Sequence, residues 1–227
     1  MFDCSVLVDR YVEDRVSILS VQFSPDGQLL ATGASDSEIR VRSLISFSIN
    51  LVLHFFQIWD IPQKRMRAKF KRHESSVNGI AFSPNGRSLV SGSLDHSVRM
   101  WSLRDGSSNI LPVTNRASFF LSVTFSPNGR YIAGGNMDNS LWIWDSRTNK
   151  VVATWLGHTG SVWCTVFTPN GKGLMSGSKD QMIKHWDVSS LGTQRGPSRG
   201  PGEQGFPEIR RFTGHNVRFF LWCHKVN

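Results

Sequence analysis

Side chains that together could hydrolyse a substrate recur in this sequence at one spacing. Histidine, serine and aspartate follow one another in the same order twice, as His73, Ser91 and Asp95 and as His158, Ser176 and Asp180. An imidazole, a hydroxyl and a carboxylate in contact are the base, nucleophile and orienting group of a hydrolase. In a buried place the same three groups can instead satisfy one another as hydrogen-bond donors and acceptors.

Tryptophan residues at a fixed distance favour the second interpretation. Trp101 and Trp186 each stand six residues after the aspartate of their set, and Trp144 stands six residues after Asp138. A recurring set with an indole donor is more than one active site requires. The sequence also contains no G-x-S-x-G turn, phosphate-binding loop or H-E-x-x-H motif. We therefore predict no catalytic residue, no metal site, no cofactor and no enzymatic activity, with a hydrolase as a remote alternative.

The composition is typical of a globular chain, and no segment is expected to cross a membrane. The 227 residues are 39% hydrophobic and 19% charged, and the three cysteines lie too far apart for a disulfide framework or a cysteine zinc site. The one long apolar run, 44–56, is shorter than the roughly 20 residues of a membrane helix. A net charge of +9 permits attraction to nucleic acid, anionic lipid or an acidic protein without choosing among them.

An internal repeat organises the chain. The string Phe-Ser/Thr-Pro-Asp/Asn-Gly occurs four times, at 23–27, 82–86, 125–129 and 167–171. About ten residues after each glycine stands an aspartate, at Asp36, Asp95, Asp138 and Asp180. The last two intervals are 43 and 42 residues, whereas the first is 59. A fixed period of this length is typical of solenoids and propellers.

Each repeat is predicted to form short strands joined by turns. In the second repeat the strands are Val77–Phe82, Ser88–Ser91 and Ser97–Trp101, because β-branched and aromatic residues alternate with Pro-Asn-Gly and Leu-Asp-His turns. Candidates for a fourth strand are 65–70, 110–113 and 151–155. Four strands in about 42 residues make one propeller blade. The expected fold is all-β, with four recognisable four-stranded blades.

These motifs resemble the WD40 repeat family over residues 16–187. The endings Ile58-Trp59-Asp60 and Ile143-Trp144-Asp145 and the dipeptides Gly157-His158 and Gly214-His215 add to the likeness. The resemblance implies a WD40 β-propeller in which a histidine, a serine or threonine, the turn aspartate and the third-strand tryptophan form a structural tetrad.

The resemblance assigns complete tetrads to the second and fourth repeats only. Their members are His73, Ser91, Asp95 and Trp101, and His158, Ser176, Asp180 and Trp186. The first repeat offers Thr32, Asp36 and Trp59, with Asp14 where histidine is expected; the third offers Asp138 and Trp144, with Arg116 and Gly134 at the histidine and hydroxyl positions. We expect packing to hold these two blades more than the tetrad does.

The resemblance also implies a surface for protein or peptide partners around the central channel. The candidates beside the turn aspartates and first-strand entries are Ser76, Leu94, Met137, Ser161, Trp163 and Lys179. Trp163 is the foremost of these because aromatic residues are enriched at binding hot spots, with packing between blades as the alternative. The basic run 64–72 is either a solvated outer strand or a partner-binding patch.

Several stretches are similar to the propellers of fungal Tup-type transcriptional corepressors: 20–27, 30–34, 162–167 and 176–180. That similarity implies a nuclear scaffold that binds repressors and chromatin factors without sequence-specific readout of nucleic acid. A cytosolic scaffold, such as a ubiquitin-ligase substrate receptor, is the alternative. The expected location is nuclear or cytoplasmic, with the nucleus favoured.

Two segments interrupt the period. Removing residues 41–57 restores the regular interval, so they are either a loop inserted into the third strand or the translation of an unspliced intron. Residues 217–227 are either a similar read-through that ends at a stop codon or a genuine short terminus. The expected organisation is an N-terminal segment at 1–15, four blades at 16–187, a Gly/Pro-rich linker at 188–211 and a truncated fifth repeat at 212–227. Four blades are expected to leave an open, incomplete propeller whose uncapped blades can self-associate.

Overall fold

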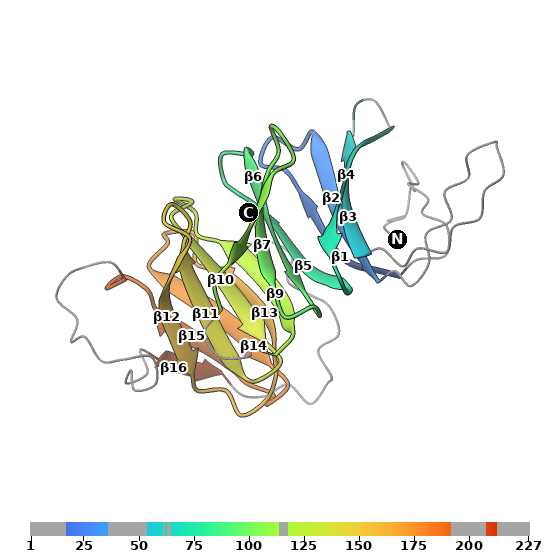
Figure 1. Cartoon of the computed structure of the whole chain (residues 1–227). Coiled ribbons are helices and arrows are strands. Elements are labelled where there is room, and N and C mark those ends of the chain that lie inside the picture. The colour runs from blue at the N-terminus through green and yellow to red at the C-terminus, as the bar shows by residue number, and fades with distance from the viewer. Residues whose placement is uncertain are drawn as a thin grey trace, which may run out of the picture.

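The computed structural model describes residues 17–35, 54–60, 62, 65–113, 118–191 and 208–212. Within these ranges the chain forms sixteen β-strands and no helix, arranged as four antiparallel four-stranded sheets. Figure 1 shows the sheets following one another along an arc. The prediction of an all-β propeller with four four-stranded blades is confirmed, and the described part of the chain is an open array.

Each sheet is one blade, and its strands are adjacent in chain order. Blade 1 contains β1 (Ser17–Phe23), β2 (Leu29–Ser35), β3 (His54–Asp60) and β4 (Arg65–His73). Blade 2 contains β5 (Val77–Phe82), β6 (Ser88–Ser93), β7 (Val98–Ser102) and β8 (Ser108–Leu111). Blade 3 contains β9 (Phe120–Phe125), β10 (Tyr131–Asn136), β11 (Ser140–Asp145) and β12 (Lys150–Leu156). Blade 4 contains β13 (Val162–Phe167), β14 (Gly173–Ser178), β15 (Ile183–Asp187) and β16 (Glu208–Phe212).

The repeated Pro-Asp/Asn-Gly strings form the turns between the first and second strands of each blade. In blade 2 the Gly86 amide donates to the Ser83 carbonyl at 2.9 Å, and Gly86 has a φ of 66°. A residue that carries a Cβ atom rarely adopts this left-handed backbone conformation, which explains why glycine occupies the position. The Asn85 side-chain oxygen accepts from the Ser83 hydroxyl at 2.7 Å and from the Arg87 amide at 3.0 Å. The turn is therefore fixed by its own sequence.

The hydrophobic core lies between blades. One cluster joins Phe70 and Ile58 of blade 1 to residues of blade 2 such as Leu89. Two further clusters join blade 2 to blade 3 and blade 3 to blade 4. Each blade is thus stabilised by its neighbour, as in other repeat proteins.

In blade 1 the structure corrects the expected bounds of the insert at residues 41–57. Residues 54–57, which the sequence analysis assigned to the insert, form the first half of β3, and Phe56 pairs with Gly33 of β2. These residues supply backbone groups that β2 would otherwise leave unpaired, which is why they join the sheet. Residues 36–53 lie outside the described ranges, and the intron interpretation stays a prediction.

The last strand of blade 4 also differs from the expected organisation. Residues 208–211 belong to β16 rather than to a linker, and Phe212 ends that strand instead of beginning a fifth repeat. β16 pairs with β15 from Ile183 to Trp186. The chain returns after the Gly/Pro-rich segment because β15 would otherwise be an unpaired sheet edge. Residues 213–227 lie outside the described ranges.

Candidate functional site

Four side chains form one hydrogen-bonded network that joins blade 2 to the end of the last strand of blade 1. The Trp101 indole nitrogen donates to the Ser91 hydroxyl oxygen at 2.7 Å. That oxygen lies 2.7 Å from His73 Nε2, and His73 Nδ1 lies 2.6 Å from Asp95 Oδ2. β7 supplies the tryptophan, β6 the serine, the end of β4 the histidine and the turn after β6 the aspartate.

When the imidazole is neutral, every donor in this hydrogen-bonded network has an acceptor. Ser91 accepts from the indole, so its own proton is directed to His73 Nε2. The proton on His73 Nδ1 is then donated to the Asp95 carboxylate. This tautomer is assigned from the network, and it gives every N–H and O–H group of the four side chains an acceptor.

Blade 4 contains the same arrangement. Trp186 donates to the Ser176 hydroxyl at 2.7 Å, and this hydroxyl lies 2.7 Å from His158 Nε2. His158 Nδ1 lies 2.7 Å from Asp180 Oδ2. The Trp186 ring stacks on Trp155 of blade 3, with ring centres 5.5 Å apart. The tetrad therefore also forms part of the contact with the preceding blade.

The tetrad aspartates have lowered pKa values. Burial alone raises the pKa of Asp95, but the hydrogen bond from His73 and the electrostatic interaction with that residue outweigh it. Hydrogen bonds from Ser97 and from the Glu74 amide lower the pKa further. For Asp180, burial likewise raises the pKa, and hydrogen bonds from His158 and from nearby backbone amides bring it below the ordinary value.

Blade 3 uses the corresponding positions differently. The Trp144 indole donates to the Pro112 carbonyl of the preceding blade at 2.8 Å, and its ring lies against Gly134. Asp138 is exposed and accepts from the hydroxyl and amide of Ser140. Arg116 lies outside the described residues.

Of the tetrad positions that the resemblance assigns to blade 1, Thr32 is the one whose side chain lies within the described residues. Thr32 is 8% exposed, and its hydroxyl has no hydrogen-bond partner within the described part of the chain. Asp36 and Asp14 lie outside the described residues, as does the side chain of Trp59.

The buried serines are poorly placed to act as nucleophiles. Ser91 is 0% exposed and Ser176 is 1% exposed, and each hydroxyl is enclosed between an indole and an imidazole. A substrate carbonyl would have to displace the tryptophan that supports the blade. The arrangement holds strands together and leaves no room for acyl transfer at these oxygens.

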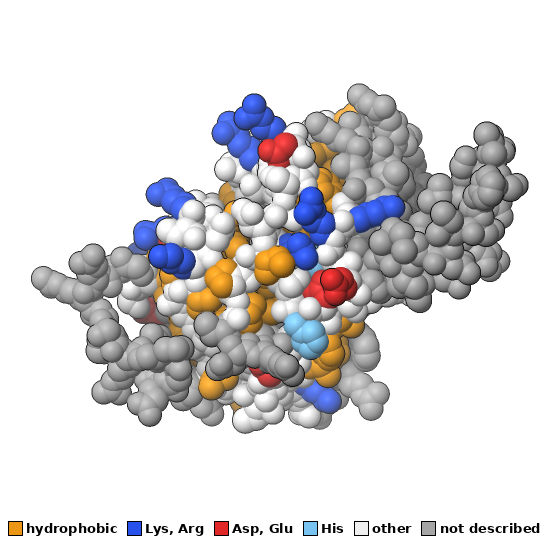
Figure 2. Space-filling view, in the orientation of Figure 1, with side chains coloured by type: hydrophobic (Ala, Val, Ile, Leu, Met, Phe, Trp, Pro, Cys, Tyr) orange, Lys and Arg blue, Asp and Glu red, His pale blue; other side chains and the backbone are white. Residues whose placement is uncertain are grey.

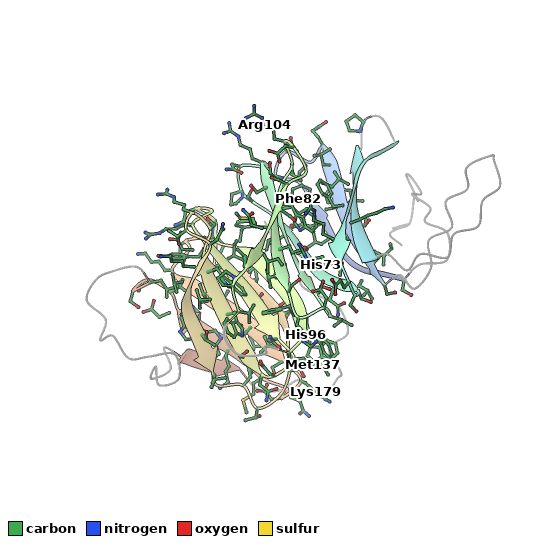
Figure 3. The ribbon with its side chains drawn as sticks, in the orientation of Figure 1. His73, Phe82, His96, Arg104, Met137 and Lys179 are labelled. Carbon is green, nitrogen blue, oxygen red and sulfur yellow. The ribbon has the colours of Figure 1, made fainter. Side chains whose placement is uncertain are left out.

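The candidate partner-binding residues lie at the end of the blades that carries the tetrad histidines, here called the tetrad end. The Leu94 amide donates to the Ser76 carbonyl at 3.0 Å, and the Lys179 amide donates to the Ser161 carbonyl at 2.8 Å. The Ser161 hydroxyl donates to the Met137 carbonyl at 3.0 Å, so this bond connects blades 3 and 4. Figure 3 shows Met137 and Lys179 together at this end of the blades.

Exposure separates the members of this group. The Met137 side chain is 48% exposed and Trp163 is 42% exposed, while Lys179 is also exposed. Ser161 is buried, and Ser76 and Leu94 are half-buried. Trp163 stands at a register shift of β13, between Val162 and Cys164, and such a bulge turns a side chain away from the regular face.

Two positions at or near this end carry features that sequence reasoning missed. His96 of blade 2 stacks on Phe119, which enters blade 3, with ring centres 4.8 Å apart. Figure 3 shows His96 in line with Met137 and Lys179. Lys184 is 2% exposed, and its ammonium group donates to the Gly157 carbonyl at 2.7 Å. Lys184 pairs with Ser176 in the ladder, and no motif in the sequence indicates its burial.

The described residues contain no cluster of three metal-binding side chains. Across the same ranges, no helix has the length and apolar character needed to cross a membrane.

The sequence was compared with known proteins. The model of the family "WD domain, G-beta repeat" matches residues 9–43, 64–102, 114–145 and 149–187. The Periodic tryptophan protein 2 homolog of Neurospora crassa is 32% identical over 90 residues, which cover 40% of this chain and 8% of that protein. Protein HIR1 of Eremothecium gossypii is 33% identical over 96 residues, covering 40% of this chain and 11% of that protein.

A third relative is the Pre-mRNA-processing factor 19 homolog 2 of Arabidopsis thaliana, 34% identical over 89 residues that cover 39% of this chain and 14% of the relative. The chain thus matches only a small part of the length of these curated relatives. The family matches, by contrast, span more than half of the chain and end in three repeats at or beside the third-strand tryptophan. The chain therefore belongs to the WD40 repeat family.

Proposed function

We propose that this chain is a non-enzymatic scaffold that binds proteins or peptides at the tetrad end, in the manner of a Tup-type transcriptional corepressor propeller. The observation that carries the proposal is the exposed pair Met137 and Trp163, which are 48% and 42% exposed on strands and turns fixed by hydrogen bonds. Binding residues presented by a rigid scaffold are typical of interaction domains. Exposed aromatic and methionine side chains are enriched where proteins meet.

The corepressor assignment rests on the similarity of the stretches 20–27, 30–34, 162–167 and 176–180 to that group. It implies a nuclear location, repressor proteins as partners and recruitment of chromatin factors. The relative named for pre-mRNA processing supports a second candidate, a scaffold in an RNA-processing assembly. A ubiquitin-ligase receptor is the cytosolic alternative.

Affinity capture from the source cells tests the proposal. The intact chain is compared with a Met137→Ala, Trp163→Ala variant, and bound proteins are identified by mass spectrometry. The control is Ile110→Ala, because Ile110 is 57% exposed but lies on the outer strand β8. We expect the double variant to lose its partners and the control to retain them.

The identity of the partners decides the finer assignment. Repressors and histone-modifying enzymes support the corepressor role, splicing factors support the RNA-processing role, and cullin-RING components support the ligase role. Retention of every partner by the double variant would overturn binding at the tetrad end.

A further inference from the structure

Basic side chains recur at the end of the blades opposite the tetrad end. They occupy the turns between the first and second strands and between the third and fourth strands, with Lys150 at the first position of β12, and all are exposed. We call this set the basic rim: Arg87, Arg104, Arg130, Arg147, Lys150 and Lys172. Figure 3 shows Arg104 at the opposite end of the blades from His96, Met137 and Lys179, and Figure 2 shows Lys and Arg side chains along that side.

Three members of the basic rim are equivalent in three successive blades. Each directly follows a turn glycine, and its carbonyl accepts an amide from the turn between the third and fourth strands. The distances are 3.0 Å from Leu103 to Arg87, 2.8 Å from Ser146 to Arg130 and 3.0 Å from Val188 to Lys172. The backbone therefore holds one cation at the same place in blades 2, 3 and 4.

These turns are also close to one another. A Cβ atom added to Gly129 would lie 3.5 Å from Pro84 of blade 2, and one added to Gly171 would lie 3.7 Å from Pro127 of blade 3. Neighbouring turns are thus in contact, and the cations they carry follow one continuous edge across blades 2 to 4.

Few exposed carboxylates lie beside the positive charges of the basic rim. In the described turns of the basic rim, Asp105 is the one exposed carboxylate, and Asp187 at the end of β15 is half-buried. Asp145 is 9% exposed and is bound by the amides of Arg147 and Thr148 and, at 3.4 Å, by Arg130. The Arg130 side chain remains 46% exposed despite this contact.

The basic rim lacks the apolar anchors of a protein-binding surface. The large exposed hydrophobic residues of the described chain include Met137 and Trp163 at the tetrad end, and none lies in these turns of blades 2 to 4. Protein interfaces depend on aromatic and other buried anchors, whereas binding to a phosphate backbone depends on Arg and Lys charge alone. The described turns of the basic rim also carry no aromatic side chain on which a base could stack, so contact with phosphate is the interaction that they favour.

We propose that the basic rim binds the phosphate backbone of nucleic acid, RNA or DNA, without reading its sequence. The rim and the tetrad end face opposite ways, so a protein partner and a nucleic acid can be held at the same time. This activity is separate from the proposed protein-binding function, because the two surfaces share no residue.

The salt dependence of nucleic-acid binding tests this proposal. Fluorescence anisotropy with short mixed-sequence single- and double-stranded RNA and DNA is recorded between about 50 and 200 mM salt. The Arg87→Gln, Arg104→Gln, Lys172→Gln variant should weaken binding equally for all sequences and reduce the salt slope by about one for each cation removed. A preference among the four probes identifies the natural polymer.

Two further variants complete the test. Lys179→Gln removes an exposed cation at the tetrad end and should leave the slope unchanged. Gln28→Arg adds a cation at the position of blade 1 that corresponds to Arg87, so it should tighten binding and raise the slope. Thermal unfolding verifies that each variant is folded.

Three results would overturn the proposal: no binding of any probe at about 50 mM salt, the same slope for the triple variant and the parent, or tighter binding of polyglutamate than of nucleic acid. Loss of protein capture by the Met137→Ala, Trp163→Ala variant leaves this measurement unaffected, so the two proposals fail separately.

Discussion

A Cβ atom added to Gly134 would lie 3.0 Å from Cζ3 of the Trp144 ring. The indole therefore occupies the space that a serine side chain fills in blades 2 and 4. Its N–H group donates to the Pro112 carbonyl, which replaces the missing hydroxyl as acceptor. The glycine and the displaced tryptophan form an alternative to the tetrad, built from packing and one backbone bond.

Restoring the family's serine in blade 3 should therefore destabilise the protein. In Gly134→Ser the new side chain meets the Trp144 ring and Phe120, whose Cδ1 would lie 3.2 Å from the new Cβ. Overpacking of this kind costs about 1–3 kcal/mol. Urea unfolding measures the change. An unchanged or higher unfolding free energy would show that the tryptophan can move aside.

Removing either tetrad serine should also destabilise its blade. Ser91→Ala removes the hydroxyl that accepts from the Trp101 indole and bonds to His73 Nε2, and Ser176→Ala removes the equivalent hydroxyl between Trp186 and His158. An unsatisfied buried group costs about 1–3 kcal/mol.

The control for both is Ser107→Ala, because Ser107 is exposed. The two serines share no partner, so the double variant should lose about the sum of the single losses. Equal unfolding midpoints for Ser91→Ala and Ser107→Ala would count against a stabilising tetrad.

Acid should unfold the protein through the tetrad aspartates. The pKa values of Asp95 and Asp180 lie below the ordinary 3.8 in the folded chain. Below that pH the unfolded chain binds more protons than the folded chain, so the stability that these carboxylates contribute is complete above it and is lost as pH falls towards their folded values.

Urea midpoints measured between neutral pH and about pH 2 should therefore decline most steeply below about pH 4. Asp95→Asn and Asp180→Asn should lower stability at neutral pH and flatten this decline. An unchanged pH dependence in the double variant would assign acid unfolding to other groups.

Equivalent phenylalanines should differ in importance between blades 1 and 2. Phe82, labelled in Figure 3, is 5% exposed and belongs to the cluster between blades 1 and 2, whereas Phe23 ends β1 and is 60% exposed. Phe82→Ala should cost about 3–5 kcal/mol. Phe23→Ala should cost about 0.5 kcal/mol, the usual effect of a surface substitution. Similar losses in denaturant unfolding would mean that Phe23 is covered in solution.

The sequence alone determined the features that each repeat builds locally. The Pro-Asn-Gly turns, the strands around them and the order of the blades follow from motifs at one period, and the predicted fold class is confirmed. The residues of the two complete tetrads could also be named, because the resemblance to the WD40 family assigns the positions and the donors and acceptors at those positions match. A short motif specifies a turn wherever it occurs.

Tertiary structure alone decided the features that depend on distant partners. Backbone pairing with β2 and β15 recruits residues 54–57 and 208–211 into strands, although their own sequences gave no such indication. The place of Trp144 depends on the space above Gly134 and on a carbonyl of the preceding blade. The burial and strand pairing of these residues depend on neighbours that are distant in the sequence. The period of the repeat does not specify which neighbours those are.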